Sequence, residues 1–325
     1  MAEEILKMVN ITKRFAGITA LDRVQFSCSK GEVHVLAGEN GAGKSTILKI
    51  LAGIHQADEG EIYFHGKKVV IRNPEQSQKL GIAMVFQELT LVGEMTVWEN
   101  IYLNQEPVTR LGRINRKEIK KRILDVMDRY GIHIDPDAPV GSLPVAEQQM
   151  AEILKILVRD PELIILDEPT SALAKKEVEQ LYQIIHNLIA DGKTIIFISH
   201  RLEELFELGD RITVFKDGCY IGTRNMNEIN EDDLIRMMVG RSLNHVFPPP
   251  VCEVDDSQVI FEVKNLADAN HKLNQVSFQV HKGEILGVAG LQGHGQTELL
   301  NAVSGLYPLS GGSIIVNGKQ VGIKN

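Results

Sequence analysis

The sequence predicts an α/β domain built on a mostly parallel sheet, with a helical subdomain inserted into it. Short apolar runs suited to buried strands, such as Val33–Ala37 and Leu163–Leu166, alternate with segments that carry apolar residues at helical spacing. Residues 96–158 carry helical patterns with no strand between them, which places the inserted subdomain at about residues 90–160. Part of the N-terminal half also recurs at the C-terminal end, so a second copy of the domain begins within the chain.

The predicted parallel sheet follows from three apolar strands and the helices between them. A Gly-rich turn follows Val33–Ala37 and opens a helix, and a second helical stripe separates Leu163–Leu166 from the next strand, Thr194–Ser199. This βαβ alternation is typical of a parallel sheet covered by helices. The residues expected to face the core from the two helices are Ile47, Leu48, Ile50 and Leu51, and then Val178, Leu181, Ile184, Ile185 and Leu188.

One helix of the inserted subdomain has a sequence signal at its start and another at its end. Asn115 and Glu118 have the spacing of a capping pair, and Gly131 suits the end of the helix. The apolar face expected between these ends consists of Ile119, Ile123, Val126 and Tyr130.

An internal repeat divides the chain into a complete and a partial domain. Residues 31–73 align with residues 283–325 without a gap, and matched glycines such as Gly38 and Gly290 lie 252 positions apart. Three consecutive prolines between the copies suit neither a helix nor a central strand, which predicts a linker. We expect a complete domain at 1–245, a Pro-rich acidic linker at 246–257, and the N-terminal part of a second domain at 258–325.

Composition and charge exclude several classes of protein. The net charge is −8 and the acidic residues are spread out, which argues against a nucleic-acid-binding surface. Cys28, Cys219 and Cys252 are far apart, so neither a disulfide framework nor a zinc site is expected. No signal peptide is visible, and no apolar run approaches the roughly 18 residues of a membrane helix. We expect a soluble, cytosolic chain.

A Gly-rich segment between a predicted strand and a predicted helix has the spacing GxxxxGK[ST]. Its backbone N–H groups would wrap phosphates, and the helix N-terminus would add partial positive charge. Lys44 would reach the β- and γ-phosphates of a nucleotide, and the Ser45 hydroxyl would bind Mg²⁺. The alternative is a chance Gly-rich turn. The predicted nucleotide-binding residues are Gly38, Glu39, Asn40, Gly41, Ala42, Gly43, Lys44, Ser45 and Thr46.

Two acidic residues at the end of a buried strand form the second half of this predicted site. Asp167 and Glu168 follow Leu163–Leu166, which would place Asp167 beside the metal and Glu168 beside the γ-phosphate. Glu168 would then polarise the attacking water. Such a pair can also be a solvated strand end, but its position downstream of the Gly-rich loop favours catalysis.

Gln87 and His200 also follow predicted strands. Gln87 would contact the metal or the water, and His200, at the end of Thr194–Ser199, would contact the γ-phosphate. Either residue alone is more often structural, but Leu143–Gln149 also opens a helix about 20 residues before the acidic pair, and the ordered set is more specific. We therefore expect Gln87, Glu168 and His200 to be catalytic, and Ser45, Gln87 and Asp167 to bind the metal.

Together these motifs resemble those of the ABC-transporter ATPases. Within that family the sequence is similar to the ATP-binding subunit of bacterial carbohydrate importers of the ribose, galactose and xylose type, which carry two ATPase domains in one chain. The resemblance runs from about residue 5 to the end. The segments that carry the closer resemblance are Val145–Met150, Thr96–Ile101, Met238–Arg241 and Gly283–Gly290.

The resemblance implies a P-loop NTPase of the ABC ATPase type. Besides the parallel core and the helical subdomain, it would have an antiparallel β subdomain. ATP and Mg²⁺ would bind, and Phe15 would stack on adenine, the alternative being an apolar residue of a β-hairpin. The implied signature loop consists of Leu143, Pro144, Val145, Ala146, Glu147 and Gln148.

The resemblance also implies partners. They would be membrane permease subunits, indirectly a sugar-binding protein, and an ATPase domain paired head to tail, with no nucleic acid. In that arrangement each ATP lies between the Gly-rich loop of one domain and the signature helix of the other. The chain would be cytoplasmic and peripheral on the inner face of the cell membrane.

The sequence departs from the family pattern at several positions. Pro144 stands where family members usually have Ser, and Ala174 where ABC proteins often have Asp. In the second Gly-rich loop Gln296 replaces Lys, and a neutral amide lacks the attraction that an ammonium has for a triphosphate. The subgroup's second loop commonly lacks Lys too. Residues 267–270, where a counterpart of Phe15 would lie, contain no aromatic residue. The second domain is therefore expected to be degenerate.

Two alternatives to sugar import remain open. A soluble ABC ATPase that acts on the ribosome or DNA would carry a basic arm or coiled-coil insertion and usually two intact loops, whereas Gln296 breaks the second loop. A binding-only or regulatory fragment is favoured by Pro144 and by the early end of the chain. Neighbouring reading frames for a permease and a binding component would favour import.

Overall fold

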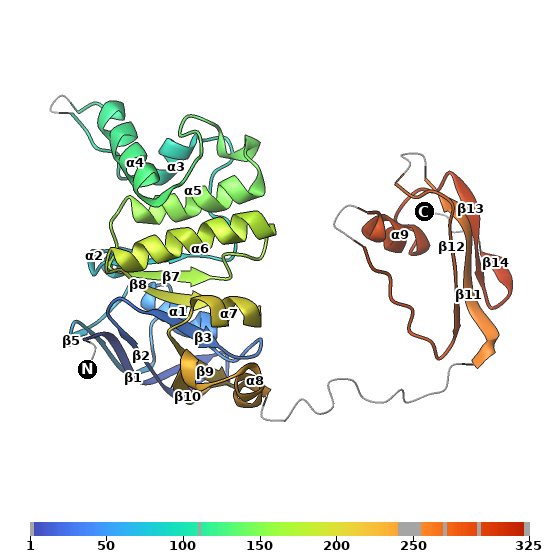
Figure 1. Cartoon of the computed structure of the whole chain (residues 1–325), viewed down its shortest axis with the longest axis horizontal. Helices are drawn as coiled ribbons and strands as arrows, with labels where there is room; N and C mark the ends of the chain where they lie inside the picture. The colour runs from blue at the N-terminus through green and yellow to red at the C-terminus, as the bar shows by residue number, and fades with distance from the viewer. Residues whose placement is uncertain (1–2, 110–111, 240–254, 269–271, 291–293, 322–325) are drawn as a thin grey trace. The chain divides into compact units, whose positions relative to one another are not determined.

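The computed structural model describes residues 3–109, 112–239, 255–268, 272–290 and 294–321. The chain divides into two compact units, Met1–Asn244 and His245–Asn325 (Figure 1). The two units are described in turn.

The first unit is built around a six-stranded sheet that is parallel except at one edge. Its strand order is β10-β9-β3-β8-β7-β6, and only β10 pairs antiparallel with its neighbour. The sequence prediction of a mostly parallel core sheet is confirmed. The strands are β10 (Cys219–Asn225), β9 (Arg211–Lys216), β3 (Val33–Ala37), β8 (Thr194–Ile198), β7 (Leu163–Asp167) and β6 (Ile82–Val85).

The central strands of this sheet are buried on both faces. Along β3, Val35 contributes to one apolar cluster and Leu36 to the other, and along β8 Phe197 and Ile196 divide in the same way. Successive side chains of a strand point to opposite faces, so a continuous apolar run forms a strand covered on both sides. This burial explains why apolar runs, rather than alternating patterns, predicted these strands.

An antiparallel sheet covers one face, as the family resemblance implied. Its order is β2-β1-β4-β5, and the apolar face of α1 shares a core cluster with it and with the parallel sheet. The elements are β1 (Glu4–Phe15), β2 (Ile18–Ser29), β4 (Glu59–Phe64), β5 (Lys67–Val69) and α1 (Lys44–Leu51). The buried residues of α1 are the four that the sequence predicted, Ile47, Leu48, Ile50 and Leu51.

The described residues of the predicted insertion form helices and no strand. Figure 1 shows α3, α4 and α5 together at one end of the first unit, with β1 and β2 at the other. The insertion consists of α3 (Val97–Tyr102), α4 (Arg116–Tyr130), a short 3₁₀ helix η1 (Val140–Ser142) and α5 (Val145–Leu157).

The signals that predicted α4 lie where they were expected, with one correction. The side chain of Asn115 accepts a hydrogen bond from the N–H of Glu118, and Gly131 ends the helix with a φ of 70°. On the apolar face, however, Met127 is buried and Val126 only partly. Helical spacing admits either residue, and packing on the neighbouring helices selects Met127.

The remaining helices of the first unit flank the parallel sheet. The buried residues of α6 are those of the predicted stripe, Val178, Leu181, Ile184, Ile185 and Leu188. The strand predicted at Thr194–Ser199 ends one residue earlier, at Ile198. These helices are α2 (Pro74–Lys79), α6 (Lys175–Ala190), α7 (Leu202–Leu208), the 3₁₀ helix η2 (Met226–Glu228) and α8 (Glu231–Val239). Among the described residues, no helix is both long and apolar enough to cross a membrane.

The second unit repeats the antiparallel part of the first. Its sheet has the order β12-β11-β13-β14, the same arrangement as β2-β1-β4-β5. The helix and the last two strands recur at the 252-residue offset seen in the sequence. The elements are β11 (Asp255–Ala267), β12 (Val276–Lys282), α9 (Gln296–Val303), β13 (Gly311–Val316) and β14 (Lys319–Val321).

The boundary between the units was predicted as a linker at 246–257. Residues 246–254 of it lie outside the described residues, and β11 already begins at Asp255. The proposed second domain at 258–325 therefore has its first strand slightly earlier than expected.

One segment of the second unit lacks the structure of its counterpart. Residues 285–289 correspond to β3, but 284–290 form no strand in the described part of the chain. Ile285 is 97% exposed, whereas its counterpart Val33 is 4% exposed. In the first unit β3 pairs with β8 and β9, whereas no strand among the described residues of the second unit pairs with this segment.

We predict that the backbone amides of residues 284–290 exchange with solvent much faster than those of 33–37. Strand amides are protected by their pairing partners, which only the first copy has among the residues that the structure describes. Hydrogen exchange with mass spectrometry compares the two peptides within one sample, and β11 and β13 serve as protected controls in the second unit. Equal protection of the two segments would contradict the expectation.

Candidate functional site

The loop between β3 and α1 depends on glycines at two positions. Gly38 has a φ of +151°, and a Cβ atom there would collide with the carbonyl oxygen of Phe215. Gly43, the N-cap of α1, has a φ of +99°, and a Cβ atom there would collide with Leu21 and with the carbonyl oxygen of Ala20. Glycine tolerates such conformations and such close approaches. The sequence therefore forms a tight loop that leads directly into the N-terminus of α1.

Lys44, the first residue of α1, holds its ammonium group against this loop. Its Nζ donates to the carbonyl oxygens of Gly38 at 2.8 Å and Glu39 at 3.0 Å. Burial lowers the pKa of Lys44 from its usual value, and the charges of Glu168 and Asp167 oppose the shift. A cation beside the positive end of a helix dipole favours an anion such as phosphate.

Asp167 and Glu168 lie at the end of β7. Asp167 is buried, and this burial raises its pKa, as does the charge of Glu168, while Lys44 and Lys49 oppose the rise. Glu168 has a left-handed φ of 49°, and its N–H donates to the carbonyl oxygen of Ile198 at 3.0 Å. Such a conformation costs a non-glycine residue about 1–3 kcal/mol. Surrounding contacts must therefore hold Glu168 in place.

Gln87 and His200 converge on the carboxylate of Glu168. Gln87 Nε2 donates to Glu168 Oε2 at 2.9 Å, and His200 Nδ1 lies 3.4 Å from the same oxygen. Gln87 follows β6 and His200 follows β8, the two neighbours of β7. Ligands of open α/β sheets bind at the carboxyl ends of the strands, where these residues meet.

These residues line one cavity of about 690 Å³. Gly38 and Glu39 lie in an adjoining cavity of about 300 Å³, which Lys44, Glu168 and His200 also line. Most of the residues predicted to bind phosphate, metal or water therefore share one space. The lining of the larger cavity consists of Asn40, Gly41, Ala42, Gly43, Lys44, Ser45, Thr46, Gln87, Asp167, Glu168, Ile198 and His200.

Buried polar side chains that the sequence reasoning missed hold the segment after Gln87. Glu152, buried on α5, accepts a hydrogen bond from Thr90 Oγ1 at 2.7 Å. Asn100, buried on α3, accepts from the N–H of Val92 at 2.7 Å and donates to its carbonyl oxygen at 3.0 Å. The available signal was a polar residue on the apolar face of each predicted helix, because such a group needs partners when buried.

Glu204 on α7 was missed in the same way. It is 3% exposed, and it accepts hydrogen bonds from the hydroxyls of Thr170 and Ser199. Both hydroxyls belong to the segments that carry Glu168 and His200.

The implied signature loop does not line the described cavity. Leu143 to Gln148 lie at the start of α5, and the helix begins at Val145. Pro144 is the N-cap and so lies just before the first helical turn, where it interrupts no helical hydrogen bond and offers no capping side chain. Ala174, the N-cap of α6, also offers none.

Phe15, expected to stack on adenine, also lies outside this cavity. It ends β1 and is 39% exposed. Its ring centroid is 5.0 Å from that of His55 in an edge-on arrangement, and the ammonium of Lys13 lies 5.3 Å from the ring. An exposed aromatic face of this kind is available for stacking, so the adenine contact stays a prediction.

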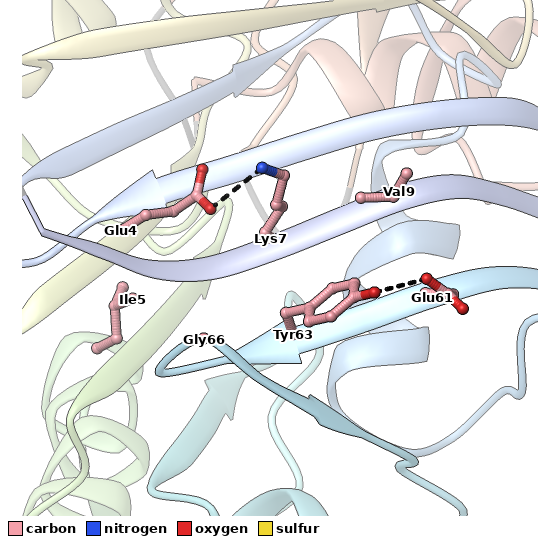
Figure 2. A pocket seen from close by; sticks show the side chains of 7 residues that line it. All are labelled: Glu4, Ile5, Lys7, Val9, Glu61, Tyr63 and Gly66. Atoms are coloured by element: carbon pink, nitrogen blue, oxygen red, sulfur yellow. Dashed lines mark hydrogen bonds and ion pairs between the residues drawn. The ribbon is translucent and has the colours of Figure 1, made fainter.

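A separate groove of about 380 Å³ lies on the antiparallel sheet and contains none of the motif residues. Figure 2 shows that its polar groups pair with one another: Lys7 lies 3.6 Å from Glu4, and the hydroxyl of Tyr63 donates to Glu61 at 2.6 Å. The residues predicted to bind phosphate, metal or water line the cavity beside Lys44 instead.

A buried cluster of Cys28, Glu32 and His34 has the residue types of a metal site. Both ring nitrogens of His34 are engaged, Nδ1 with Glu32 and Nε2 with Thr213, each at 2.8 Å. Arg211 lies 3.1 Å from Glu32. Burial raises the pKa of Cys28 well above its usual value, so the thiol stays protonated. The cluster is a closed polar network that joins the two sheets.

Comparison with known proteins agrees with this geometry. The model of a family described as "ABC transporter" matches residues 21–171 and 273–325, which include both Gly-rich loops. A putative ribose/galactose/methyl galactoside import ATP-binding protein 2 from Agrobacterium fabrum is 47% identical over 99% of this chain and 62% of its own length. A ribose import ATP-binding protein from Rubrobacter xylanophilus is 42% identical over 99% of this chain and 64% of its own length. The chain thus spans about 62% of the length of the first of these relatives.

Solved structures agree as well. An ATP-binding cassette of an ABC transporter in its ADP conformation has a TM-score of 0.64 and 27% identity, over 73% of this chain and 99% of that one. A bacterial ABC transporter cassette solved as a dimer has a TM-score of 0.60 and 27% identity, over 68% of this chain and 99% of that one. With the Gly-rich loop, the carboxylate pair and the fold in agreement, the chain belongs to the ABC transporter family.

Proposed function

We propose that this chain binds and hydrolyses ATP with Mg²⁺, and that the reaction energises import of a sugar through a membrane permease. The observation that carries the proposal is the convergence of Lys44, Ser45, Asp167, Glu168 and His200 on one cavity. The relatives' names, which refer to import of ribose, galactose and methyl galactoside, support a sugar as the cargo.

The chemistry of the cavity fits a magnesium-bound triphosphate. Ser45, Asp167 and Gln87 offer a hydroxyl, a carboxylate and an amide oxygen, and Mg²⁺ prefers oxygen ligands of these kinds. Lys44 and the backbone N–H groups of the loop suit phosphate oxygens. When bound, Mg²⁺ would neutralise part of the charge on the transferred phosphoryl group.

Glu168 would orient and polarise the attacking water. Its carboxylate accepts a hydrogen bond from Gln87 and lies beside His200, and these two residues follow the strands on either side of β7. Phosphoryl transfer depends mainly on positioning and electrostatic stabilisation, which a fixed carboxylate and a fixed cation supply. In this division of roles Lys44 binds phosphate and Glu168 acts on the water.

A groove between the helical insertion and the core suits the permease partner. It is a cavity of about 360 Å³ whose lining includes Met84, Phe86 and Ile156, with Lys155 and Arg159 among its charged residues. A groove lined by apolar and charged side chains fits an amphipathic cytoplasmic segment of the permease. Thr90, in the segment that follows Gln87, also lines it, so a partner there would lie close to the chemistry. This contact would hold the chain on the inner face of the membrane, with a sugar-binding protein as an indirect partner.

A paired ATPase domain would complete the site. The signature loop and the cavity lie on different elements of the first unit, and the structural relative solved as a dimer supports assembly of two such domains. In a head-to-tail pair the Pro144 signature would face the second domain's loop, in which Gln296 replaces Lys. The complete set around Lys44 would face the second domain's signature, which this chain does not contain.

The site separates binding from turnover in a testable way. Lys44→Ala should weaken ATP binding at least about tenfold, because an ammonium that contacts phosphate is lost. Glu168→Gln should keep the affinity and lower hydrolysis about a hundredfold or more, because only the charge that acts on the water is lost. Calorimetric ATP titration and phosphate release measure the two effects.

Matched controls come from the groove of Figure 2. Lys7→Ala and Glu4→Gln make the same chemical changes at exposed positions outside the cavity and should leave both measurements unchanged. The proposed division of roles fails if Glu168→Gln binds ATP as poorly as Lys44→Ala.

The composite arrangement predicts that residues 1–325 bind ATP but hydrolyse it slowly. Adding a complete second domain should raise the rate, because its signature helix would stabilise charge on the γ-phosphate. Phosphate release with and without the added domain, at saturating ATP, checks this. Fast turnover that the added domain leaves unchanged would contradict the composite site and favour a self-sufficient ATPase.

Transport itself tests the choice of cargo. With the permease in proteoliposomes and the complete second domain present, ATP should drive uptake of labelled ribose or galactose, and the Glu168→Gln chain should not. ATP hydrolysis without uptake of any pentose or hexose would favour the soluble, non-transport ATPase, and ATP binding without hydrolysis the regulatory fragment.

A further inference from the structure

Glu204, in the first turn of α7, carries a buried carboxylate to which the proposed mechanism gives no role. Its Oε2 accepts hydrogen bonds from Thr170 Oγ1 at 2.8 Å and Ser199 Oγ at 2.6 Å, and its Oε1 accepts from Arg201 Nη1 at 3.2 Å. Thr170 is 2% exposed and Ser199 is 7% exposed. Hydrogen bonds from hydroxyls to a buried carboxylate are short and strong, so this contact is a firm one.

The two hydroxyls belong to the segments that carry the reactive groups. Thr170 follows Glu168 by two residues, and Ser199 directly precedes His200. Ser199 Oγ also accepts from the N–H of Arg201 at 3.0 Å, which closes the turn around His200. The carboxylate of Glu204 therefore holds both segments by hydrogen bonds, within two residues of Glu168 and His200.

The backbones of both reactive residues need support from other segments. The side chain of His200 is 62% exposed, so its position depends on the backbone of residues 199–201. Glu168 has a left-handed backbone that requires external support. An apolar residue at position 204 could fill the same space, but it could not hold two hydroxyls in fixed directions.

We infer that Glu204 is a positioning residue that sets the places of Glu168 and His200 relative to each other and to the γ-phosphate. The inference rests on the proposed ATPase function. Glu204 acts through Thr170 and Ser199 and does not touch the reacting atoms. Misplacement of a reactive group by about 1 Å costs on the order of a hundredfold in rate. Loss of the hydrogen bonds to Glu204 should therefore lower the rate of hydrolysis more than the affinity for ATP.

The first test compares substitutions of one side chain. Glu204→Ala should lower single-turnover hydrolysis of bound ATP by about tenfold to a hundredfold, with the dissociation constant for ATP little changed. Glu204→Gln should recover most of the rate, because its amide oxygen can accept both hydroxyls while the exposed Arg201 moves away. The matched control is Glu203→Gln, the same change at the exposed neighbour on α7, which should keep the parent rate.

The second test removes the hydroxyls instead. Thr170→Val and Ser199→Ala should each lower the rate at unchanged ATP affinity. Added to Glu204→Ala, either substitution should lower the rate little further, because the three side chains act as one unit. If the rate losses of the single variants multiply in the double variants, the three side chains do not act as one unit.

A third readout does not require turnover. With MgATP bound, the backbone amides of 168–172 and 199–203 should exchange slowly in the parent chain and in Glu203→Gln, and both segments should exchange faster in Glu204→Ala. A melting temperature recorded for each variant identifies general destabilisation. The inference is overturned if Glu204→Ala hydrolyses ATP at the parent rate, if rate and affinity fall together with the melting temperature, or if exchange is unaltered. Absence of ATP binding by the parent chain would instead contradict the proposed function.

Discussion

The candidate site depends on three neighbouring parallel strands, β3, β8 and β7, that end at one edge of the sheet. Their pairing sets Val35 opposite Phe197, and Phe197 opposite Leu166, so the three strands end almost level. Because each is buried on both faces, a shift of register would expose apolar side chains and break backbone hydrogen bonds. The Gly-rich loop, the carboxylate pair and His200 each begin where one of these strands ends. These groups meet because the register of the three strands is fixed.

This convergence removes charged side chains from water. Burial and the adjacent Glu168 raise the pKa of Asp167, and burial lowers the pKa of Lys44, so each charged form is less favourable than in water. A magnesium-bound triphosphate carries charge of both signs and would offset these costs as it binds. Groups that are arranged in advance need little reorganisation during reaction, which is the advantage that such a site offers phosphoryl transfer.

Comparison of the two copies of the repeat shows which elements form in both and which forms only beside its neighbouring strands. Helix α9 forms at the position that corresponds to α1, because a helix closes its hydrogen bonds within its own segment. Residues 284–290 have the apolar sequence of β3 but remain exposed, since a strand needs neighbours for its backbone groups. Gln296 also stands in place of Lys44 in this copy. The antiparallel sheet and the helix thus form in both copies, whereas the segment equivalent to β3 forms a strand only where its flanking strands are present.

Several elements of the first unit, and the residues that meet at the cavity, could be predicted from the sequence. The strand Val33–Ala37, the buried stripe of α6, the cap at Asn115 and the motif residues could all be predicted, because periodicity, capping and loop chemistry act over a few neighbouring residues. Other outcomes required the packed structure: Met127 rather than Val126 is buried, and Pro144 lies before the helix. Glu152 and Glu204 also accept hydrogen bonds from Thr90 and Thr170, which belong to the segments after Gln87 and Glu168. Those outcomes depend on which elements pack together. Contacts such as that between Thr170 and Glu204 join residues 34 positions apart, and no local pattern encodes them.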